Sequence, residues 1–360
     1  MSEKQSNVVA IDLRQAVAPE PVEKKGYGTA KYVTFGEDNK YPDFLLHCYD
    51  ECSILQSIIN GLSDYVAGSG FVVGDAERIV NEKGETYLSL VQRCAVDYII
   101  FGAFCIGIRR DKEHRIAFLD YHDPRTIRLN EDGDEAYYCK DWSKSNRRVV
   151  TLPIFNPKNK VQDRSEMYVK TAASRSLYGR PMWGSATKDV MTAIEISTFH
   201  LSAILNNFMP SAVVSFNNGE PENSVKKEIE RKINDKFSGA KNAARLLVSF
   251  NDSKDHAVTV ERLSEDNFDQ RYQALSKSVK ENIFIAFRAH PQLFGADPER
   301  TGFNSVEYQQ SFELFKETVV KPIQSRIEAA FATIGDEWRF TLAEFNVPFT
   351  DSSAQEGATV

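Results

Sequence analysis

The chain has 360 residues, 42% of them hydrophobic and 26% charged, which excludes a disordered or collagen-like protein. With 44 Lys and Arg against 51 Asp and Glu, its net charge is −7, and it lacks the strongly basic character usual in a sequence-specific DNA-binding domain. At roughly 100–200 residues per domain, the length predicts two or three domains.

Residues 1–29 form a polar N-terminal segment without sustained periodicity, which predicts a flexible arm. Apolar residues then recur at three- and four-residue steps over residues 53–66 and 85–101, and each stretch predicts a helix. A strand is expected after each helix, at residues 71–73 and 103–109, because a glycine ends the helix and an apolar run follows.

Further strands are predicted between residues 115 and 153, separated by turn clusters such as 130–133 (NEDG). Their predicted ranges are residues 115–121, 126–129, 136–142 and 147–153. Strands mixed with helices predict an α+β unit for roughly the first 180 residues.

The pattern changes after the turn at Tyr178–Pro181, and long helices follow. Apolar stripes at helical spacing predict helices at residues 186–208, 265–290 and 305–331, the last kinked at Pro322. A small β-α-β segment lies between the first two, with strands at 212–216, 245–250 and 257–261 and a helix at 223–237. A final strand is expected at residues 338–345.

The five cysteines are loosely spaced and indicate a reducing compartment. Cys48 and Cys52 have the spacing of a metal-ligand pair, but no second Cys or His pair follows at the distance of a zinc site. The N-terminus has no apolar signal-peptide core, and no run of 18 apolar residues exists to cross a membrane. No Walker A loop, HExxH motif or GxSxG nucleophile elbow occurs, and the six histidines are scattered. The sequence therefore predicts no enzyme, cofactor or metal site.

Two acidic groups leave an enzymatic alternative open, a metal-dependent nuclease or nucleotidyltransferase. They are Asp111, Glu113 and His114, and Asp120, His122 and Asp123. Both groups fall at predicted strand ends, where turn chemistry also explains acidic residues. Residues 131–135 (EDGDE) lack the spacing of a calcium loop and predict a solvated turn.

A basic patch reverses the charge locally between residues 221 and 248, where seven basic and four acidic residues give +3. The basic residues are Lys226, Lys227, Arg231, Lys232, Lys236, Lys241 and Arg245. One interpretation is a solvated helix face with pairs such as Glu228–Lys232. The other is a surface that faces a phosphate or a partner protein.

Four stretches, in order, resemble the portal proteins of tailed bacteriophages, in the branch of the P2-like and HK97-like portals. They are residues 97–104 (DYIIFGAF), 176–181 (SLYGRP), 285–295 (IAFRAHPQLFG) and 315–324 (FKETVVKPIQ). The first resembles a helix that ends in Phe-Gly before an aromatic strand, and the second a Tyr-Gly-x-Pro turn before a stem helix. The third and fourth resemble a helix followed by Pro and Leu-x-Gly, and a helix with an internal proline.

The resemblance implies a portal fold of the α+β class with named regions. The wing would comprise residues 30–185 and a returning strand at 333–349, and the stem helices 186–208 and 263–290. The clip would be 209–262, the tunnel loop 291–304 and the kinked helix 305–332, with a flexible tail at 350–360. Few residues follow Phe349, so we expect no substantial helical crown. Candidate channel residues in the tunnel loop are Gln292, Asp297, Arg300, Thr301 and Asn304.

The function implied by the resemblance is a non-enzymatic ring, normally of twelve copies, at one vertex of the phage head. The ring would be the channel for packaging and ejecting double-stranded DNA, which passes non-specifically, and an acidic chain suits a channel that must not grip phosphates. Implied partners are the terminase large subunit and the head-tail adaptor at the clip, and the major capsid and scaffold proteins. The protein would be part of the virion, assembled in the host bacterial cytoplasm. Another phage head-tail connector protein is a further alternative.

Overall fold

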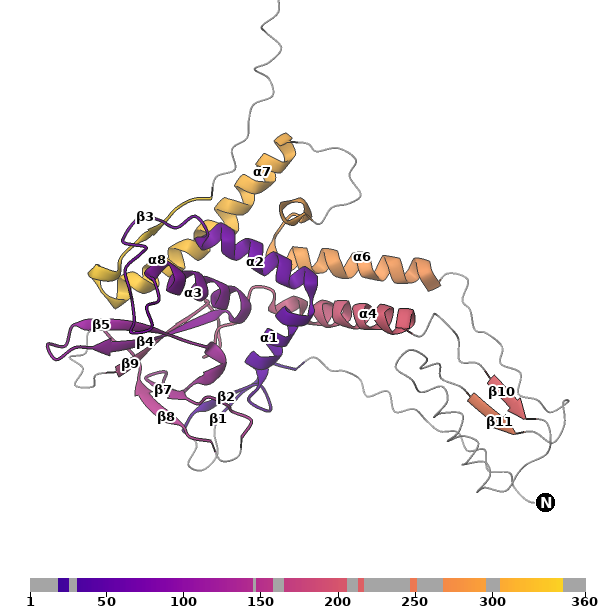
Figure 1. The fold of residues 1–360 in the computed structure, drawn as a ribbon, viewed down its shortest axis with the longest axis horizontal. Coiled ribbons are helices and arrows are strands. Elements are labelled where there is room, and N and C mark those ends of the chain that lie inside the picture. The colour runs from indigo at the N-terminus through magenta and orange to yellow at the C-terminus, as the bar shows by residue number, and fades with distance from the viewer. Residues whose placement is uncertain are drawn as a thin grey trace, which may run out of the picture. The chain divides into compact units, whose positions relative to one another are not determined.

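The computed structural model describes residues 19–25, 31–144, 147–157, 165–205, 213–216, 247–250, 268–295 and 305–345 (Figure 1). The chain divides into two units. The first comprises Met1–Lys188 and Phe284–Val360, and the second is the intervening segment Asp189–Ile283.

Three helices begin the first unit: α1 (Tyr41–Glu51), α2 (Ser53–Ala67) and α3 (Tyr87–Phe101). The predicted helices at 53–66 and 85–101 are confirmed as α2 and α3, whereas α1 was not predicted. Helix α3 begins two residues later than expected because Thr86 is its cap and accepts a hydrogen bond from the Ser89 N–H at 3.3 Å. It ends at Gly102, which has a φ of +70°.

Two three-stranded antiparallel sheets follow (Figure 1). In the first, β4 (Ala103–Arg110) lies between β5 (Ile116–His122) and β9 (Ser165–Thr171). In the second, β7 (Glu135–Tyr138) lies between β6 (Ile127–Leu129) and β8 (Val150–Pro153). The predicted strands are confirmed here, although β7 and β8 are shorter than expected and β9 was not predicted.

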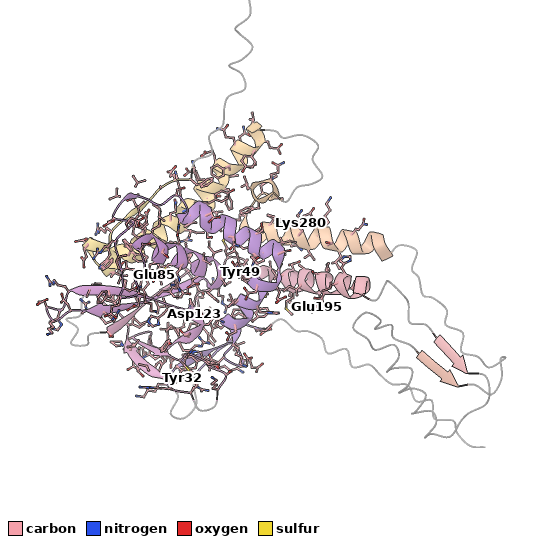
Figure 2. All side chains as sticks on the ribbon, viewed as in Figure 1. Tyr32, Tyr49, Glu85, Asp123, Glu195 and Lys280 are labelled. Carbon is pink, nitrogen blue, oxygen red and sulfur yellow. The ribbon has the colours of Figure 1, made fainter. Side chains whose placement is uncertain are left out.

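A small aromatic core stabilises the second sheet. The rings of Tyr32 and Trp142 lie 4.7 Å apart, and Tyr137 completes the group from β7 (Tyr32 is labelled in Figure 2). Trp142 was expected in a strand that ran to residue 142. Instead the strand ends at Tyr138, and the indole ring turns into this core at 7% exposure.

Two short strand pairs correct the predictions made for the ends of the chain. Strand β1 (Glu23–Lys25) pairs with β2 (Val33–Phe35), so the arm predicted to be flexible over residues 1–29 contains ordered residues. Strand β12 (Thr341–Leu342) pairs with β3 (Phe71–Val73) and is much shorter than the predicted strand at 338–345.

Trp338 explains why the last strand is short. Asp336–Trp338 forms a 3₁₀ turn that buries the Trp338 ring completely, with the Arg78 guanidinium 3.7 Å above it. The Tyr87 hydroxyl donates a hydrogen bond to the Trp338 carbonyl oxygen. These long-range contacts replace the alternation of inward and outward residues that the sequence suggested.

The C-terminal helical segment of the first unit is not one regular helix. It comprises α7 (Ser305–Phe315), a π turn (Lys316–Val320) and α8 (Lys321–Ile334). Phe331 on α8 is fully buried against Tyr87 and Phe104, whose ring centroids lie 5.5 and 6.2 Å away. This aromatic packing ties α8 to α3 and to the central strand β4.

Most of α4 (Thr187–Leu205) and α6 (Phe268–Phe287) belongs to the second unit, together with β10 (Val213–Phe216) and β11 (Leu247–Phe250). Both helices and both strands were predicted. The strands pair in parallel, as a β-α-β segment requires. The helix predicted at 223–237 and the strand predicted at 257–261 lie outside the described residues. Asn282 Nδ2 donates to Asp189 Oδ1 at 2.9 Å and links α6 to α4.

Candidate functional site

The start of the predicted tunnel loop forms a tight turn in the first unit. The chain leaves α6 at Arg288, whose φ of +53° lies in the left-handed region, and the Ala289 N–H donates to the Phe284 carbonyl oxygen at 3.0 Å. A 3₁₀ turn, η4 (Pro291–Phe294), follows directly. His290 caps it, since its Nδ1 accepts from the Gln292 N–H at 3.4 Å.

Helix α2 anchors this turn. The Tyr65 hydroxyl donates to the Leu293 carbonyl oxygen at 2.9 Å. The Phe294 ring lies over Gly61, where a Cβ atom would approach the ring to 2.9 Å. Such a separation is shorter than van der Waals contact, so only glycine fits at this position without a shift of the ring.

Tyr65 is also the centre of an aromatic group, named here the Tyr65 cluster. Its ring lies 5.0 to 6.2 Å, edge to face, from four phenylalanine rings: Phe294, Phe312, Phe315 and Phe345. Burial, helped by the neighbouring Tyr308 hydroxyl, raises the pKa of Tyr65 to about 12, so the phenol stays protonated and can donate. Phe294 lies near the start of the expected tunnel loop (291–304) and Phe312 lies after its end, so one tyrosine contacts both the start of the loop and the helix that follows it.

The π turn between α7 and α8 is the second feature of this region. Pro322 has no N–H, and in a regular helix its ring would clash with the preceding turn. The helix instead forms one wider turn, in which the Lys321 N–H donates to the carbonyl oxygen of Lys316, five residues earlier. The predicted kink at Pro322 therefore takes the form of a π turn just before the proline.

Lys316 is charged but only 8% exposed. Its ammonium group lies 2.8 Å from Glu313 and 3.6 Å from Glu344. A hydrogen bond to Glu313 is the main cause of its raised pKa. The ion pairs join the π turn to the segment after β12, and the two glutamates balance the buried charge of Lys316.

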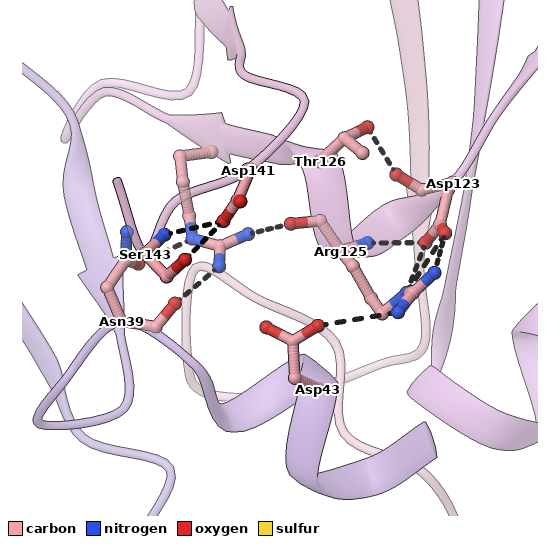
Figure 3. A network of polar contacts seen from close by, with 8 residues as sticks. Asn39, Asp43, Asp123, Arg125, Thr126, Asp141 and Ser143 are labelled. Carbon is pink, nitrogen blue, oxygen red and sulfur yellow. Dashed lines mark hydrogen bonds and ion pairs between the residues drawn. The ribbon is translucent and has the colours of Figure 1, made fainter. Parts of the chain in front are cut away.

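The acidic residues of the enzymatic alternative are occupied by arginines. Asp120 Oδ2 accepts from Arg109 Nε at 2.6 Å. Asp123 caps the turn η1 (Pro124–Thr126) and accepts from Arg125 Nη2 at 2.7 Å, as Figure 3 shows. Asp111 and Glu113 both pair with Arg115. Each of these carboxylates is therefore neutralised locally by an arginine.

Burial lowers the pKa of the His122 imidazole, and this effect outweighs the nearby Asp120 charge, which acts in the opposite direction. The ring packs edge to face on Tyr138 at 5.4 Å. Throughout the described part of the chain, no group of three or more His, Cys, Asp or Glu residues is arranged to hold a metal ion. Nor does any helix there have the length and apolar character that crossing a membrane demands.

The same region contains a fully buried arginine. Arg128 is 0% exposed, and burial lowers the pKa of its guanidinium group. Its Nε and Nη2 donate to the side-chain and main-chain oxygens of Asn39 at 2.6 and 2.7 Å, and Nη1 donates to the Arg125 carbonyl oxygen (Figure 3). These bonds fasten Asn39, two residues before α1, to β6, so the network is structural.

The model of the phage portal protein family matches residues 78–348 of the chain. The chain belongs to this family. The match covers most of both described units, including the turn after α6 and the π turn. A search of curated protein sequences found no match.

Two solved structures from gene transfer agent necks share the fold of this chain. The chain is 15% identical to a protein from the neck of an empty gene transfer agent particle, with a TM-score of 0.53 over 81% of this chain and 80% of that one. A protein from the neck of the native particle is 14% identical, with a TM-score of 0.52 over 84% and 85%. An HK97-family phage portal protein from Corynebacterium diphtheriae is 15% identical, with a TM-score of 0.49 over 79% and 88%.

Most of the predicted portal site residues lie outside the described residues. Gln292 is half-buried in η4, and its N–H is bound by His290. The remaining tunnel-loop residues, Asp297, Arg300, Thr301 and Asn304, lie outside the described ranges. So does the whole basic patch: Lys226, Lys227, Arg231, Lys232, Lys236, Lys241 and Arg245.

Sequence reasoning missed the Tyr65 cluster. Phe312 and Phe315 belong to the apolar stripe that predicted the portal helix at 305–331. Tyr65 lies beside the stripe of α2, and nothing near it in the sequence indicates partners 228 residues away. The one indication in the sequence is that Tyr65 adjoins Val66 of the apolar stripe, because a tyrosine hydroxyl that becomes buried usually has a hydrogen-bond partner.

Proposed function

We propose that the protein forms the portal ring of a tailed phage head, the channel through which double-stranded DNA is packaged and ejected. The match of the portal family model to residues 78–348 carries this proposal. In it, the ring is a non-enzymatic component of the virion that is assembled in the host bacterium. The terminase large subunit and the head-tail adaptor dock on it, and it also contacts the major capsid and scaffold proteins.

A closed ring is supported by apolar side chains that the single chain leaves exposed. Leu201 on α4 is 58% exposed and Leu275 on α6 is 47% exposed, and both belong to the apolar stripes of the predicted stem helices. Burial of such residues by a neighbouring copy would be favourable by about 25 cal/mol per Å². Heterologous contacts of this kind close into rings when the rotation permits.

A ring of twelve copies is proposed because the gene transfer agent necks were computed with six-fold and twelve-fold symmetry. In this ring, α4 and α6 would be the stem, residues 209–262 the clip and residues 291–304 the tunnel loop. The Tyr65 cluster would then hold the base of the tunnel loop in the wing. The net charge of −7 would limit attraction between the channel wall and DNA phosphates.

The first test is the mass of the purified full-length protein by native mass spectrometry, with negative-stain images of the same sample. Twelve copies of 40.7 kDa give about 490 kDa and a ring with a central hole. Only monomers and dimers, both alone and after addition of the scaffold and major capsid proteins, would overturn the ring.

A further inference from the structure

A cavity of about 190 Å³ lies in the first unit, where the chain leaves for the second unit and returns from it. Tyr98 on α3, Arg180 before α4, Arg288 after α6 and Arg326 on α8 all line it. A water molecule needs roughly 10–15 Å³ of such space, so the cavity has room for a small ion and several waters.

The three arginines have no acidic counterpart. No acidic residue lines the cavity, and none of the three forms an ion pair within the residues that the structure describes. Several other arginines of the same unit contact a carboxylate, namely Arg109, Arg110, Arg115 and Arg125, whereas Arg78 and Arg128 bond to carbonyl or amide oxygens. All three arginines are exposed and therefore solvated, and an anion in the cavity would meet three guanidinium groups at once.

The backbone holds two of these arginines in place. Arg180 follows Gly179 in a turn pressed against Gly102, where a Cβ atom would lie 2.3 Å from the Arg180 carbonyl oxygen. Its Nε donates to Ser176 Oγ at 3.1 Å and its Nη2 to the Pro21 carbonyl oxygen at 3.3 Å. Arg288 is held by the left-handed turn that ends α6. The main chain that carries Arg180 and Arg288 is therefore fixed on both sides of the cavity.

The fourth group is a hydroxyl without a partner. The Tyr98 side chain is 5% exposed, and its hydroxyl oxygen is buried with no hydrogen-bond partner in the described structure. Burial raises the pKa of this phenol, while the positive charge of Arg326 beside it and a hydrogen-bonding interaction with its guanidinium group act in the opposite direction. The phenol stays protonated, so its hydrogen is available to donate to an anion that Arg326 also contacts.

We propose that this cavity is a binding site for a phosphate-type oxyanion, held by Arg180, Arg288, Arg326 and the Tyr98 hydroxyl. Guanidinium groups match phosphate oxygens in pairs of parallel hydrogen bonds and keep their charge at any working pH. Three positive charges complement a phosphate better than a single carboxylate. The phosphate can be a free ion or part of a nucleic acid backbone. The inference does not depend on the ring, because all four groups come from one chain.

The test is titration of the full-length protein with inorganic phosphate by isothermal titration calorimetry, in a buffer free of phosphate and sulfate. We expect saturable binding of one phosphate per chain. Arg326→Gln and Arg288→Gln should each weaken it by about tenfold or more, and Tyr98→Phe by a few-fold. Arg148→Gln, which removes an exposed arginine far along the chain from these residues, is the matched control and should leave binding unchanged.

Absence of saturable phosphate binding, or equal affinity in Arg326→Gln and the parent protein, would overturn the site. Equal unfolding temperatures of variant and parent exclude misfolding as the cause of weaker phosphate binding. Tyr98→Phe removes only a hydroxyl and therefore tests the site with little risk to the fold. Tighter binding of glutarate than of phosphate would also overturn the proposal, in favour of an acidic side chain from a partner. Competition by a short DNA duplex identifies a backbone phosphate as the natural ligand, and its failure to compete identifies the free ion.

Discussion

The Tyr65 hydroxyl donates a hydrogen bond to the Leu293 carbonyl oxygen at 2.9 Å, and so joins helix α2 to a turn 228 residues later. The same tyrosine contacts rings on both sides of residues 296–304. Tyr65 therefore joins the chain before residue 296 to the chain after residue 304.

The Tyr65 hydrogen bond can be tested without disturbing the aromatic packing. Tyr65→Phe removes the hydroxyl and leaves the Leu293 carbonyl oxygen without this donor, so unfolding free energy should fall by about 1 kcal/mol. Denaturant unfolding measures it. Tyr49→Phe is the control, since that hydroxyl donates to Asn60 at 2.7 Å on an exposed surface and should change stability by under about 0.5 kcal/mol. Equal losses in the two variants would contradict an anchoring role for Tyr65.

Gly61 should tolerate no side chain. Gly61→Ala places a methyl group 2.9 Å from the Phe294 ring and should destabilise the protein by about 1–3 kcal/mol, as overpacking does. Gly184→Ala is the matched control, because a Cβ atom there meets Pro181 at 3.7 Å, an ordinary contact. A thermal unfolding comparison in which Gly61→Ala is as stable as Gly184→Ala would show that the turn moves aside easily.

The exposed apolar residues of α6 separate folding from assembly. Leu275→Asp alters a side chain that is 47% exposed, so the monomer should keep its unfolding temperature while the yield of rings falls sharply. Val279→Asp introduces a charge at a position only 4% exposed and should destabilise the chain itself. Ser276→Asp, an exposed neighbour, is the control for added charge. Native mass spectrometry and thermal unfolding give the two readouts, and intact rings from Leu275→Asp would show that this face is not at the interface.

The basic patch is predicted to bind a partner. Changing Lys232 and Lys236 to Glu should leave ring mass unchanged and weaken docking of the terminase large subunit or the adaptor at least several-fold at low salt. Lys112→Glu, an exposed lysine in the first unit, controls for net charge. If surface plasmon resonance finds docking equal in both variants, the patch is a solvated helix face.

Asp97 predicts a pH dependence of stability. Its carboxyl is buried, Oδ2 has no hydrogen-bond partner in the described structure, and burial raises its pKa well above the ordinary value. Because the folded protein favours the protonated carboxyl, Asp97 costs no stability below the pKa of about 4 that it has in the unfolded chain. Stability is then lost as the pH rises toward the higher pKa that Asp97 has in the folded protein. Asp97→Asn should therefore be more stable than the parent near neutral pH, with the difference shrinking toward pH 4. Denaturant unfolding across this range measures it. Asp64→Asn, at an exposed position, should show a much smaller trend.

The sequence predicted the elements whose apolar residues repeat regularly, such as α2, α3, β4 and α6. It did not predict β9, where Glu166, Met167 and Tyr168 are buried in succession. Glu166 is buried because Arg110 from the neighbouring strand pairs with it at 2.7 Å, and such a partner is invisible in a local pattern. The candidate site shows the same limit. Local periodicity located the turn after α6, but its anchor Tyr65 and the arginines of the cavity come together only through the fold.

The π turn at Lys316–Val320 sets the phase between two helices. A π turn acts as one extra residue in an α-helix, and each residue of an α-helix rotates the chain by about 100°. Deleting one residue from this turn would restore regular pitch and swing the aromatic side of α7 away from Tyr65 by about that angle. The π turn that precedes Pro322 therefore sets the rotation of α7 at which Phe312 and Phe315 face Tyr65.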